Sequence, residues 1–171
     1  MEWDKITDII LIAALVILGI FACLGLFQLI TRRSLKKVDK QILWLIVPTL
    51  LMVAVWFLCD KILPTFIPNY PTRPDGSGEP SFPSTHVMFV TTIFFCISAA
   101  LPKYTKSKTA IFCMDMVMFI LASLVATGRV LANKHSVFDV IGAVIFSFMF
   151  YEIYYALIRR KKTQKEVAKH E

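Results

Sequence analysis

The sequence has little of what supports a disordered, fibrous or disulfide-bonded protein. Glycine and proline number only 6 and 8 among 171 residues, and no internal repeat is present, which excludes a disordered or collagen-like chain. The four cysteines show no CxxC spacing, so neither a zinc site nor a disulfide framework is indicated. Charged residues are also few, at 18%, whereas 57% of the residues are apolar and the mean hydropathy is +0.65. A soluble domain of this length does not hide so much apolar surface, so the sequence predicts a membrane protein.

Five apolar segments are each long enough to cross a bilayer as a helix. A hydrocarbon core about 30 Å thick needs roughly 20 residues at about 1.5 Å of rise per residue. The segments are 9–30, 41–59, 82–101, 109–128 and 137–158. They leave little chain for a soluble domain. We therefore expect an all-α, polytopic transmembrane helix bundle that forms a single domain over residues 1–171, with a basic cytoplasmic tail at 159–171.

Lysine and arginine are distributed unevenly between the two sides of this expected bundle. Fourteen of the 19 fall in the segments 31–40, 102–108 and 159–171. Cytoplasmic loops of membrane proteins are enriched in these residues, so the N-terminus is expected outside and the C-terminus in the cytoplasm. An odd number of spans gives the same orientation. The net charge of +7 is therefore a signal of topology and not of nucleic-acid binding.

The two outer loops, expected at 60–81 and 129–139, and the helix ends beside them carry most of the residues suited to chemistry. Helix ends at one membrane face converge even when they are distant in the sequence. We therefore expect a single pocket that collects Lys61, Arg73, Ser84, His86, Arg129, His135 and Asp139.

These residue types suit a phosphate ester. Lysine and arginine give charge-assisted hydrogen bonds to phosphoryl oxygens, and arginine offers a planar fork that holds two of them. Pro83 and Ser84 begin a span, whose free N–H groups and positive dipole end attract an anion. Two histidines, His86 and His135, then allow a double displacement, in which one ring attacks phosphorus and the other protonates the departing oxygen.

The spacing of Asp139 allows two local structures. On a helix, Asp139 shares a face with His135 four residues earlier, so the carboxylate can accept the imidazole N–H and fix its tautomer. The segment Ser136-Val-Phe-Asp139 also fits a capping box, which starts the helix at Ser136 and directs the carboxylate to backbone N–H groups. We favour the imidazole partner.

Two segments carry a resemblance to a known family. Pro83-Ser84-Thr85-His86 resembles the PSGH motif, and Gly128-Arg129-x5-His135-x3-Asp139 resembles the SR-x5-H-x3-D motif, of the type 2 phosphatidic acid phosphatases, membrane relatives of the vanadium haloperoxidases. The resemblance implies that His135 is the nucleophile, that Asp139 orients it and that His86 is the general acid. It implies that a further set of residues binds the phosphate: Arg73, Arg129, Ser84, Thr85 and Lys61. The family works without a metal, so neither a metal nor another cofactor is expected.

Three features depart from the family pattern. The family places a lysine seven residues before its Arg-Pro pair, where this chain has Phe66, and the nearest lysine is Lys61. Thr85 stands where glycine is usual, and Gly128 stands where serine is usual, which removes one hydroxyl group. The family commonly has six spans, so five indicate a minimal version that lacks one N-terminal helix.

The resemblance implies a multi-pass lipid phosphatase of the plasma (inner) membrane, with its active site on the extracytoplasmic side. We expect it to remove the terminal phosphate of a phosphorylated lipid at the outer leaflet through a phosphohistidine intermediate. A small, lysine-rich chain favours a bacterial protein and hence undecaprenyl diphosphate, with phosphatidic acid and phosphatidylglycerol phosphate as alternatives.

Two other classes of protein stay open. One is a metal-dependent membrane protein that uses His86, His135 and Asp139 as ligands, because His and Asp four residues apart is also a metal-binding spacing. The other is a non-catalytic, lipid-binding membrane subunit. The expected partners are the phosphorylated lipid and the bilayer, with no nucleic acid, and the sequence indicates no particular oligomeric state.

Overall fold

The structure is a computed structural model that describes residues 2–32 and 38–167. Five helical stretches within these residues are long and apolar enough to cross a membrane, which confirms the prediction of an all-α chain with five membrane-compatible helices. The expected loop residues 33–37 and tail residues 168–171 lie outside the described residues. The elements in chain order are α1 (Glu2–Arg32), α2 (Lys40–Trp44), α3 (Ile46–Phe57), η2 (Leu58–Ile62), α4 (Leu63–Phe66), α5 (Thr85–Tyr104), α6 (Lys108–Leu131) and α7 (Val137–Val167).

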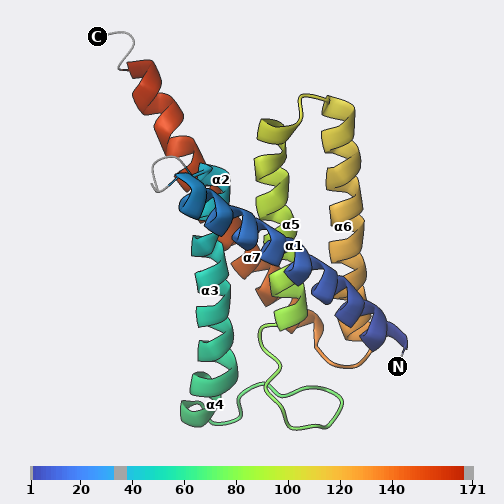
Figure 1. The fold of residues 1–171 in the computed structure, drawn as a ribbon. Helices are drawn as coiled ribbons and strands as arrows, with labels where there is room; N and C mark the ends of the chain where they lie inside the picture. Colours follow the sequence, from blue (N-terminus) through green and yellow to red (C-terminus); the bar gives the residue numbers. More distant parts are fainter. Residues whose placement is uncertain (1, 33–37, 168–171) are drawn as a thin grey trace.

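Helix α5 is the centre of the bundle (Figure 1). It packs against α1, α6 and α7, and its buried residues Val87, Met88, Val90 and Phe94 belong to the main hydrophobic core. Helix α1 crosses the bundle obliquely, so that it contacts α6 near its own start and α2 near its end (Figure 1). Helix α3 packs against α7.

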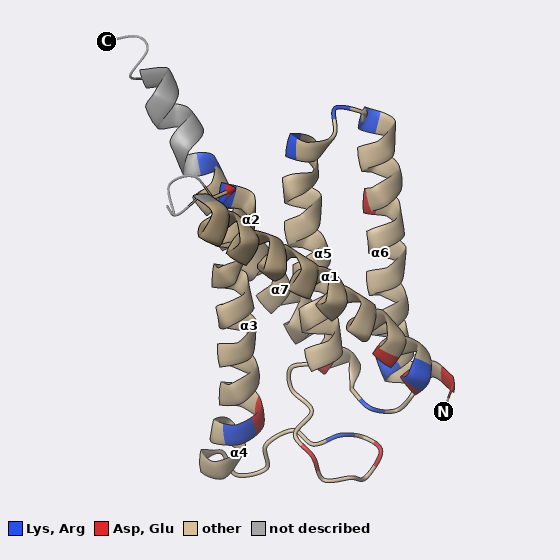
Figure 2. Cartoon of the chain, viewed as in Figure 1, with Lys and Arg blue, Asp and Glu red and all other residues tan. Residues whose placement is uncertain are grey.

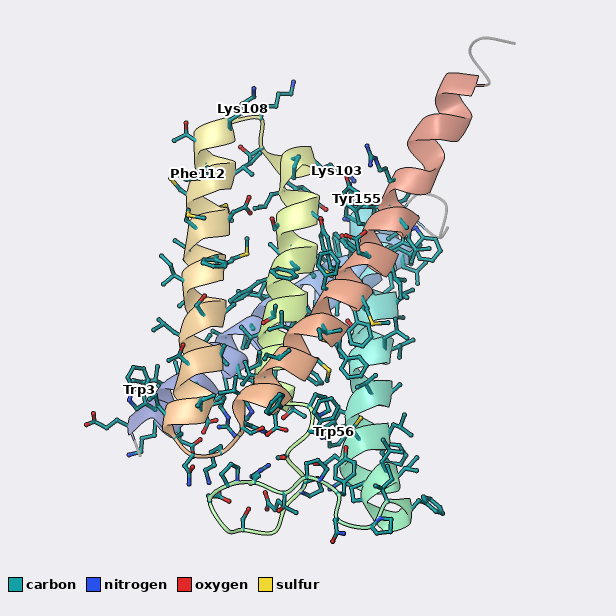
Figure 3. All side chains as sticks on the ribbon, turned by 180° about the vertical axis from the view of Figure 1, so that it is seen from behind. Trp3, Trp56, Lys103, Lys108, Phe112 and Tyr155 are labelled. Atoms are coloured by element: carbon teal, nitrogen blue, oxygen red, sulfur yellow. The ribbon has the colours of Figure 1, made fainter. Side chains whose placement is uncertain are left out.

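The outward faces of the helices carry large apolar side chains that stay exposed, among them Phe27, Phe112 and Phe138. Charged residues gather at the two ends of the bundle (Figure 2). Trp3 and Trp56 lie toward one end, and Lys103 and Lys108 lie at the other (Figure 3). Apolar faces between charged ends are the surface that a bilayer requires, so the chain has the exterior of a multi-pass membrane protein.

The second span is longer than the sequence predicts. It was expected to end at residue 59, but it continues through a π-helical turn, η2, into α4. Pro64 lacks an N–H, and its ring clashes with the carbonyl of Asp60 in a regular α-helix. The turn before it is widened, with the Leu63 N–H donating to the Leu58 carbonyl, and the apolar run continues past the proline. The outer loop expected from residue 60 therefore begins at residue 67.

The last two spans also differ from their expected limits. Helix α6 extends to Leu131, so Arg129 lies in its last turn and not in a loop. Helix α7 continues to Val167, so most of the expected tail continues the helical backbone. The loop 67–84 and the turn 132–136 lie at the same end of the bundle as the start of α1 (Figure 1).

Candidate active site

Four segments meet at the end of the bundle where α1 starts. They are the loop 67–84, the start of α5, the last turn of α6 and the turn 132–136 into α7. The backbone N–H of Ser84 donates to the Asp139 carbonyl at 3.1 Å, and the Ser81 hydroxyl donates to the Asp139 carboxylate at 3.3 Å. The backbone N–H of His135 donates to the Arg129 carbonyl at 3.3 Å. These contacts fix the loop 67–84 against the turn 132–136. The motif at residues 83–86 and the motif at residues 128–139 both lie at this junction.

His135 is held by the loop through one ring nitrogen. Its Nδ1 lies 2.9 Å from the Ser81 carbonyl, which can only accept a hydrogen bond, so Nδ1 carries the proton and donates. Its Nε2 is buried and has no hydrogen-bond partner among the described residues. In this tautomer the Nε2 lone pair is free. His135 lines a small cavity together with Arg73 and Thr85.

The predicted pairing of Asp139 with the imidazole is wrong in the structure. The Asp139 carboxylate accepts from the Ser136 N–H at 2.7 Å, and the Ser136 hydroxyl accepts from the Asp139 N–H at 3.3 Å. The Asp139 Oδ2 atom lies 3.9 Å from the His135 Nδ1 atom, which is too far for a hydrogen bond. Because α7 begins at Val137, Ser136 stands at its N-cap and exchanges two hydrogen bonds with Asp139, as in a capping box, and His135 stays outside the helix. The Asp139 carboxylate therefore contacts the Ser136 N–H and the Ser81 hydroxyl, and not the His135 ring.

The surroundings of His135 favour its neutral form. Burial and the positive charges of Arg129 and Arg73 lower its pKa to about 4, and the nearby Asp139 carboxylate only partly opposes them. The ring is therefore neutral at physiological pH, and in this form Nε2 keeps a free lone pair.

This lowered pKa predicts a titration midpoint near pH 4 for the His135 ring, against an ordinary value of 6.5. Labelled histidine in a His86→Gln, His170→Gln variant leaves His135 as the sole ring for NMR titration in detergent micelles. Since the unfolded chain binds this proton near pH 6.5 and the folded chain only near pH 4, folding stability falls by roughly 3 kcal/mol as the pH drops through that window. Above pH 6.5 the group has no effect on stability. A midpoint near 6.5 contradicts the buried, neutral ring.

Two arginines direct free donors toward this region. Arg129 is 4% exposed, and its Nη1 donates to the Asp4 carboxylate at 2.6 Å. Arg73, in the loop, forms an ion pair with Glu79. In both residues the Nε atom is buried and has no partner among the described residues. Each guanidinium is thus anchored through one nitrogen and keeps another donor for a ligand.

The start of α5 adds further donors. Ser84 is the N-cap residue of α5, is fully buried, and its hydroxyl makes no cap hydrogen bond. Buried polar atoms in proteins are nearly always paired. In the described part of the chain, six buried side-chain polar atoms have no partner, and five belong to the predicted site. These five are Arg73 Nε, Ser84 Oγ, His86 Nδ1, Arg129 Nε and His135 Nε2. Arg73 Nε, Arg129 Nε and Ser84 Oγ, with the N-terminus of α5, form a donor set suited to a phosphoryl group, whereas the two unpaired ring nitrogens offer lone pairs in the neutral rings.

A family model described as the PAP2 superfamily matches residues 57–163, more than half of the chain. The chain belongs to the PAP2 superfamily. This confirms the resemblance to the type 2 phosphatidic acid phosphatases, and with its membrane-compatible helices the protein is a PAP2 phosphatase of multi-pass membrane type. Comparisons with curated proteins and with solved structures give no match.

Lys61 lies apart from the other residues predicted to bind phosphate in this PAP2 protein. It lies on η2, its side chain is 58% exposed, and it pairs with Asp60 at 2.8 Å. Its neighbour Asp60, and not Lys61, lines the cavity beside His135. The longer second span explains the difference, because a lysine on a helix cannot turn inward as one in a loop can.

Sequence reasoning missed two carboxylates on α1, which precedes the segment matched by the PAP2 model. Asp8 Oδ1 lies 2.8 Å from His86 Nε2, and Asp4 pairs with Arg129. Their spacing of four residues on one helix face was the available signal, but the expected first span began only at residue 9. Helix α1 also explains one departure from the family motif, since a Cβ at Gly128 would lie 2.7 Å from Thr7 Cγ2.

Proposed function

We propose that this PAP2 protein is an extracytoplasmic lipid phosphatase that hydrolyses a polyprenyl diphosphate, such as undecaprenyl diphosphate, through a phosphohistidine and without a metal. Residues 1–171 act as one membrane-embedded domain in this proposal. The observation that carries it is the free Nε2 of a neutral His135 in the same cavity as Arg73. Arg129 and Ser84, whose backbones bond to His135 and Asp139, add further unpaired donors at this junction.

The reaction follows from these atoms. His135 Nε2 attacks the terminal phosphorus, forming the N–P bond while the bond to the departing oxygen breaks. His86, the second ring at this end, gives a proton to that oxygen. Water then attacks the phosphohistidine, its proton returns to His86, and inorganic phosphate leaves. Asp139 holds the turn and the Ser81 carbonyl that fix the His135 tautomer.

The remaining residues stabilise negative charge on the phosphoryl group. Arg73 and Arg129 supply guanidinium donors, and Ser84 and Thr85 supply a hydroxyl and the free backbone N–H groups at the start of α5. Preorganised donors of this kind act most strongly in a buried site, where water does not compete.

Cationic side chains supply the positive charge in this arrangement, which supports catalysis without a metal. Among residues 2–32 and 38–167, no group of three His, Cys, Asp or Glu side chains is close enough to hold a metal ion. In particular, Asp139 binds backbone N–H and hydroxyl groups, so it is not positioned as a third ligand beside the two histidines.

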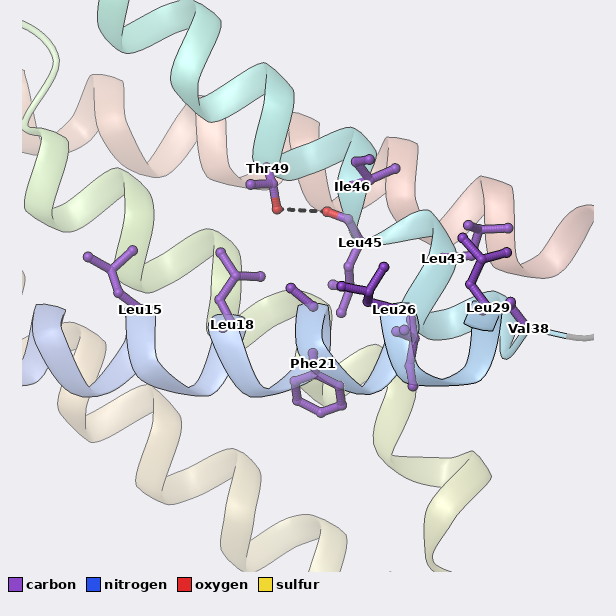
Figure 4. Close-up of a pocket in the computed structure, with 14 residues that line it drawn as sticks. Leu15, Leu18, Phe21, Leu26, Leu29, Val38, Leu43, Leu45, Ile46 and Thr49 are labelled. Carbon is purple, nitrogen blue, oxygen red and sulfur yellow. Dashed lines mark hydrogen bonds between the residues drawn. The ribbon is translucent and has the colours of Figure 1, made fainter. Parts of the chain in front are cut away.

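An apolar groove between α1 and α3 supports a lipid substrate. A cavity of about 330 Å³ begins at Thr85 and His86 and is otherwise lined by apolar side chains from α1, α3 and α5. It adjoins, at Leu15, a cavity of about 510 Å³ between the second half of α1 and the α2–α3 segment (Figure 4). The Thr49 side chain lies in the wall of the larger cavity, but its hydroxyl donates to the Leu45 carbonyl and so leaves no unpaired O–H facing the tail.

The length of this groove favours a long single tail. Its lining runs along α1 from Leu11 to Leu29, which is about 27 Å of helix axis. The hydrocarbon core is about 30 Å thick, so each acyl chain of a phospholipid covers roughly half of that distance. A polyprenyl tail is long enough to fill the groove while the diphosphate lies at His86.

The distribution of basic residues supports an extracytoplasmic site. Lys103 and Lys108 lie at the end of the bundle away from the candidate site (Figure 3), as do the end of α1 and the start of α2 (Figure 1). The excess of lysine and arginine at that end favours the cytoplasm.

The proposal is tested by a panel of phosphorylated lipids in detergent, scored for inorganic phosphate released by the purified chain. We expect kcat/KM for undecaprenyl diphosphate to exceed those for phosphatidic acid and phosphatidylglycerol phosphate, with no loss in excess EDTA. Preference for a phospholipid contradicts the tail assignment, and loss in EDTA contradicts metal independence. No release above that of a His135→Ala variant indicates a non-catalytic subunit.

The groove is tested in the same panel by filling it. Gly19 lines the larger cavity, and a side chain added there meets nothing within 4 Å. We expect Gly19→Phe to raise KM for undecaprenyl diphosphate by about tenfold, because the ring occupies the path of the tail. KM for the short dimethylallyl diphosphate should stay unchanged. Ile20→Phe, on the exposed face of α1, is the matched control. Equal effects on both substrates, or from both variants, contradict the tail groove.

A further inference from the structure

Two carboxylates of α1 reach the candidate site from outside the segment that the family model matches. Asp8 Oδ1 lies 2.8 Å from His86 Nε2 and 3.9 Å from Arg129 Nη1, and Asp4 Oδ1 lies 2.6 Å from Arg129 Nη1. The rotation of α1 is fixed between them, because Thr7 is fully buried and packs at Gly128 of α6. Helix packing therefore turns Asp4 and Asp8 toward the site, although their side chains are 34% and 52% exposed.

The two nitrogens of His86 have different surroundings. Nε2 faces the Asp8 carboxylate, which only accepts, so Nε2 keeps its hydrogen and donates. Nδ1 is buried and has no partner among the described residues. A proton that moves to or from this ring during reaction must therefore move at Nδ1.

We propose that Asp8 is the positioning residue of the general acid, holding the His86 ring so that Nδ1 delivers the proton and favouring the imidazolium that carries it. The inference rests on the proposed phosphatase reaction and adds α1 to its machinery. When the bond from phosphorus to the departing oxygen breaks, Nδ1–H goes to that oxygen and His86 becomes neutral. When water attacks the phosphohistidine, its proton returns to Nδ1. Throughout, Nε2–H stays bonded to Asp8.

The charges around His86 are consistent with this role. Burial of the ring and, from α6, the positive charge of Arg129 oppose a positive charge on His86, and Asp4, which pairs with Arg129, offsets only part of this opposition. Asp139 of α7 accepts hydrogen bonds from Ser136 and Ser81. Asp60 of η2 lines the cavity beside His135 and not the groove beside His86. Asp8 is thus the carboxylate in contact with the ring, and it stabilises the protonated state that donation requires.

The test compares Asp8→Asn, Asp8→Glu and Asp4→Asn in the purified full chain. We expect Asp8→Asn to lower kcat about tenfold or more at pH 8 with little change in KM, and to move the basic limb of the kcat profile about one pH unit lower. Asp8→Glu should restore most of kcat and return the basic limb close to its wild-type position. Asp4→Asn removes a carboxylate one turn away that acts on the ring mainly through Arg129, so it should move the limb in the same direction but by clearly less. An unchanged limb in Asp8→Asn, or equal shifts in both asparagine variants, overturns the proposal.

A second measurement does not depend on activity. In a His135→Gln, His170→Gln background, NMR of labelled histidine reports the His86 ring alone. We expect the neutral ring to carry its hydrogen on Nε2 and its titration midpoint to fall when Asp8 is replaced by asparagine. A hydrogen on Nδ1, or an unmoved midpoint, overturns the assignment of Asp8 even if the wild-type chain releases phosphate. The expected NMR result together with an inactive wild type contradicts the phosphatase reaction and with it the role of Asp8 as a partner of a general acid.

Discussion

Replacing His135 with alanine is expected to abolish phosphate release, lowering kcat by about 10⁴-fold or more. The variant loses the nitrogen that attacks phosphorus, and removal of a covalent nucleophile usually costs a factor of this size. Residues 2–32 and 38–167 offer no substitute, because the other histidine at this end, His86, keeps one nitrogen on Asp8 and lines the groove and not the small cavity. The measurement is phosphate release from undecaprenyl diphosphate in detergent.

A trapping experiment separates loss of the nucleophile from loss of the fold. Wild type quenched during turnover of labelled substrate should carry label on histidine, in the acid-labile and alkali-stable form typical of a phosphohistidine, and His135→Ala should carry none. His170→Ala, which removes a histidine from the tail, is the matched control and should retain the label. His135→Ala should also keep a cooperative thermal unfolding transition. Label on His135→Ala, or activity within tenfold of wild type, contradicts the assignment of the nucleophile.

The number and type of the helices were predictable because apolar length alone decides whether a segment can cross a bilayer. Their ends were not, since these depend on single residues. Pro64 forces a wide turn and lets the second span run on, and the N-cap of α7 excludes His135 from its first turn. Sequence patterns give both the apolar run and the possible cap. They do not show whether the Asp139 carboxylate accepts from the His135 ring or from the Ser136 N–H.

The candidate site was predictable to the extent that its motifs fix their own spacing. The motif residues from α5, α6 and α7 do gather at one end of the bundle, with His135 beside Arg73. The contact of Asp8 with His86 joins residues 78 positions apart. It depends on the angle at which α1 crosses the bundle, and that angle is set by packing such as Thr7 at Gly128, which no local pattern contains.

Loss of a guanidinium is expected to have the second largest effect, and it distinguishes the two arginines from Lys61. Arg129→Ala and Arg73→Ala should each lower kcat/KM by about 10²-fold to 10³-fold, the cost of removing one preorganised donor to developing negative charge. Lys61→Ala should cost less than about threefold, because this side chain is exposed and paired with Asp60 outside the cavity.

One further variant, Arg129→Lys, tests the shape of the guanidinium separately from its charge. Arg129→Lys retains the charge but loses the fork that both binds Asp4 and leaves Nε free, so it should fall between wild type and Arg129→Ala. Arg129 is buried, so thermal unfolding must show that its variants fold. Arg73 lies in the loop 67–84 and gives the same test without opening a helix interface. If Lys61→Ala loses as much activity as Arg73→Ala, then Lys61 reaches the phosphate during turnover, and the second span must bend at its π-helical turn to bring it there.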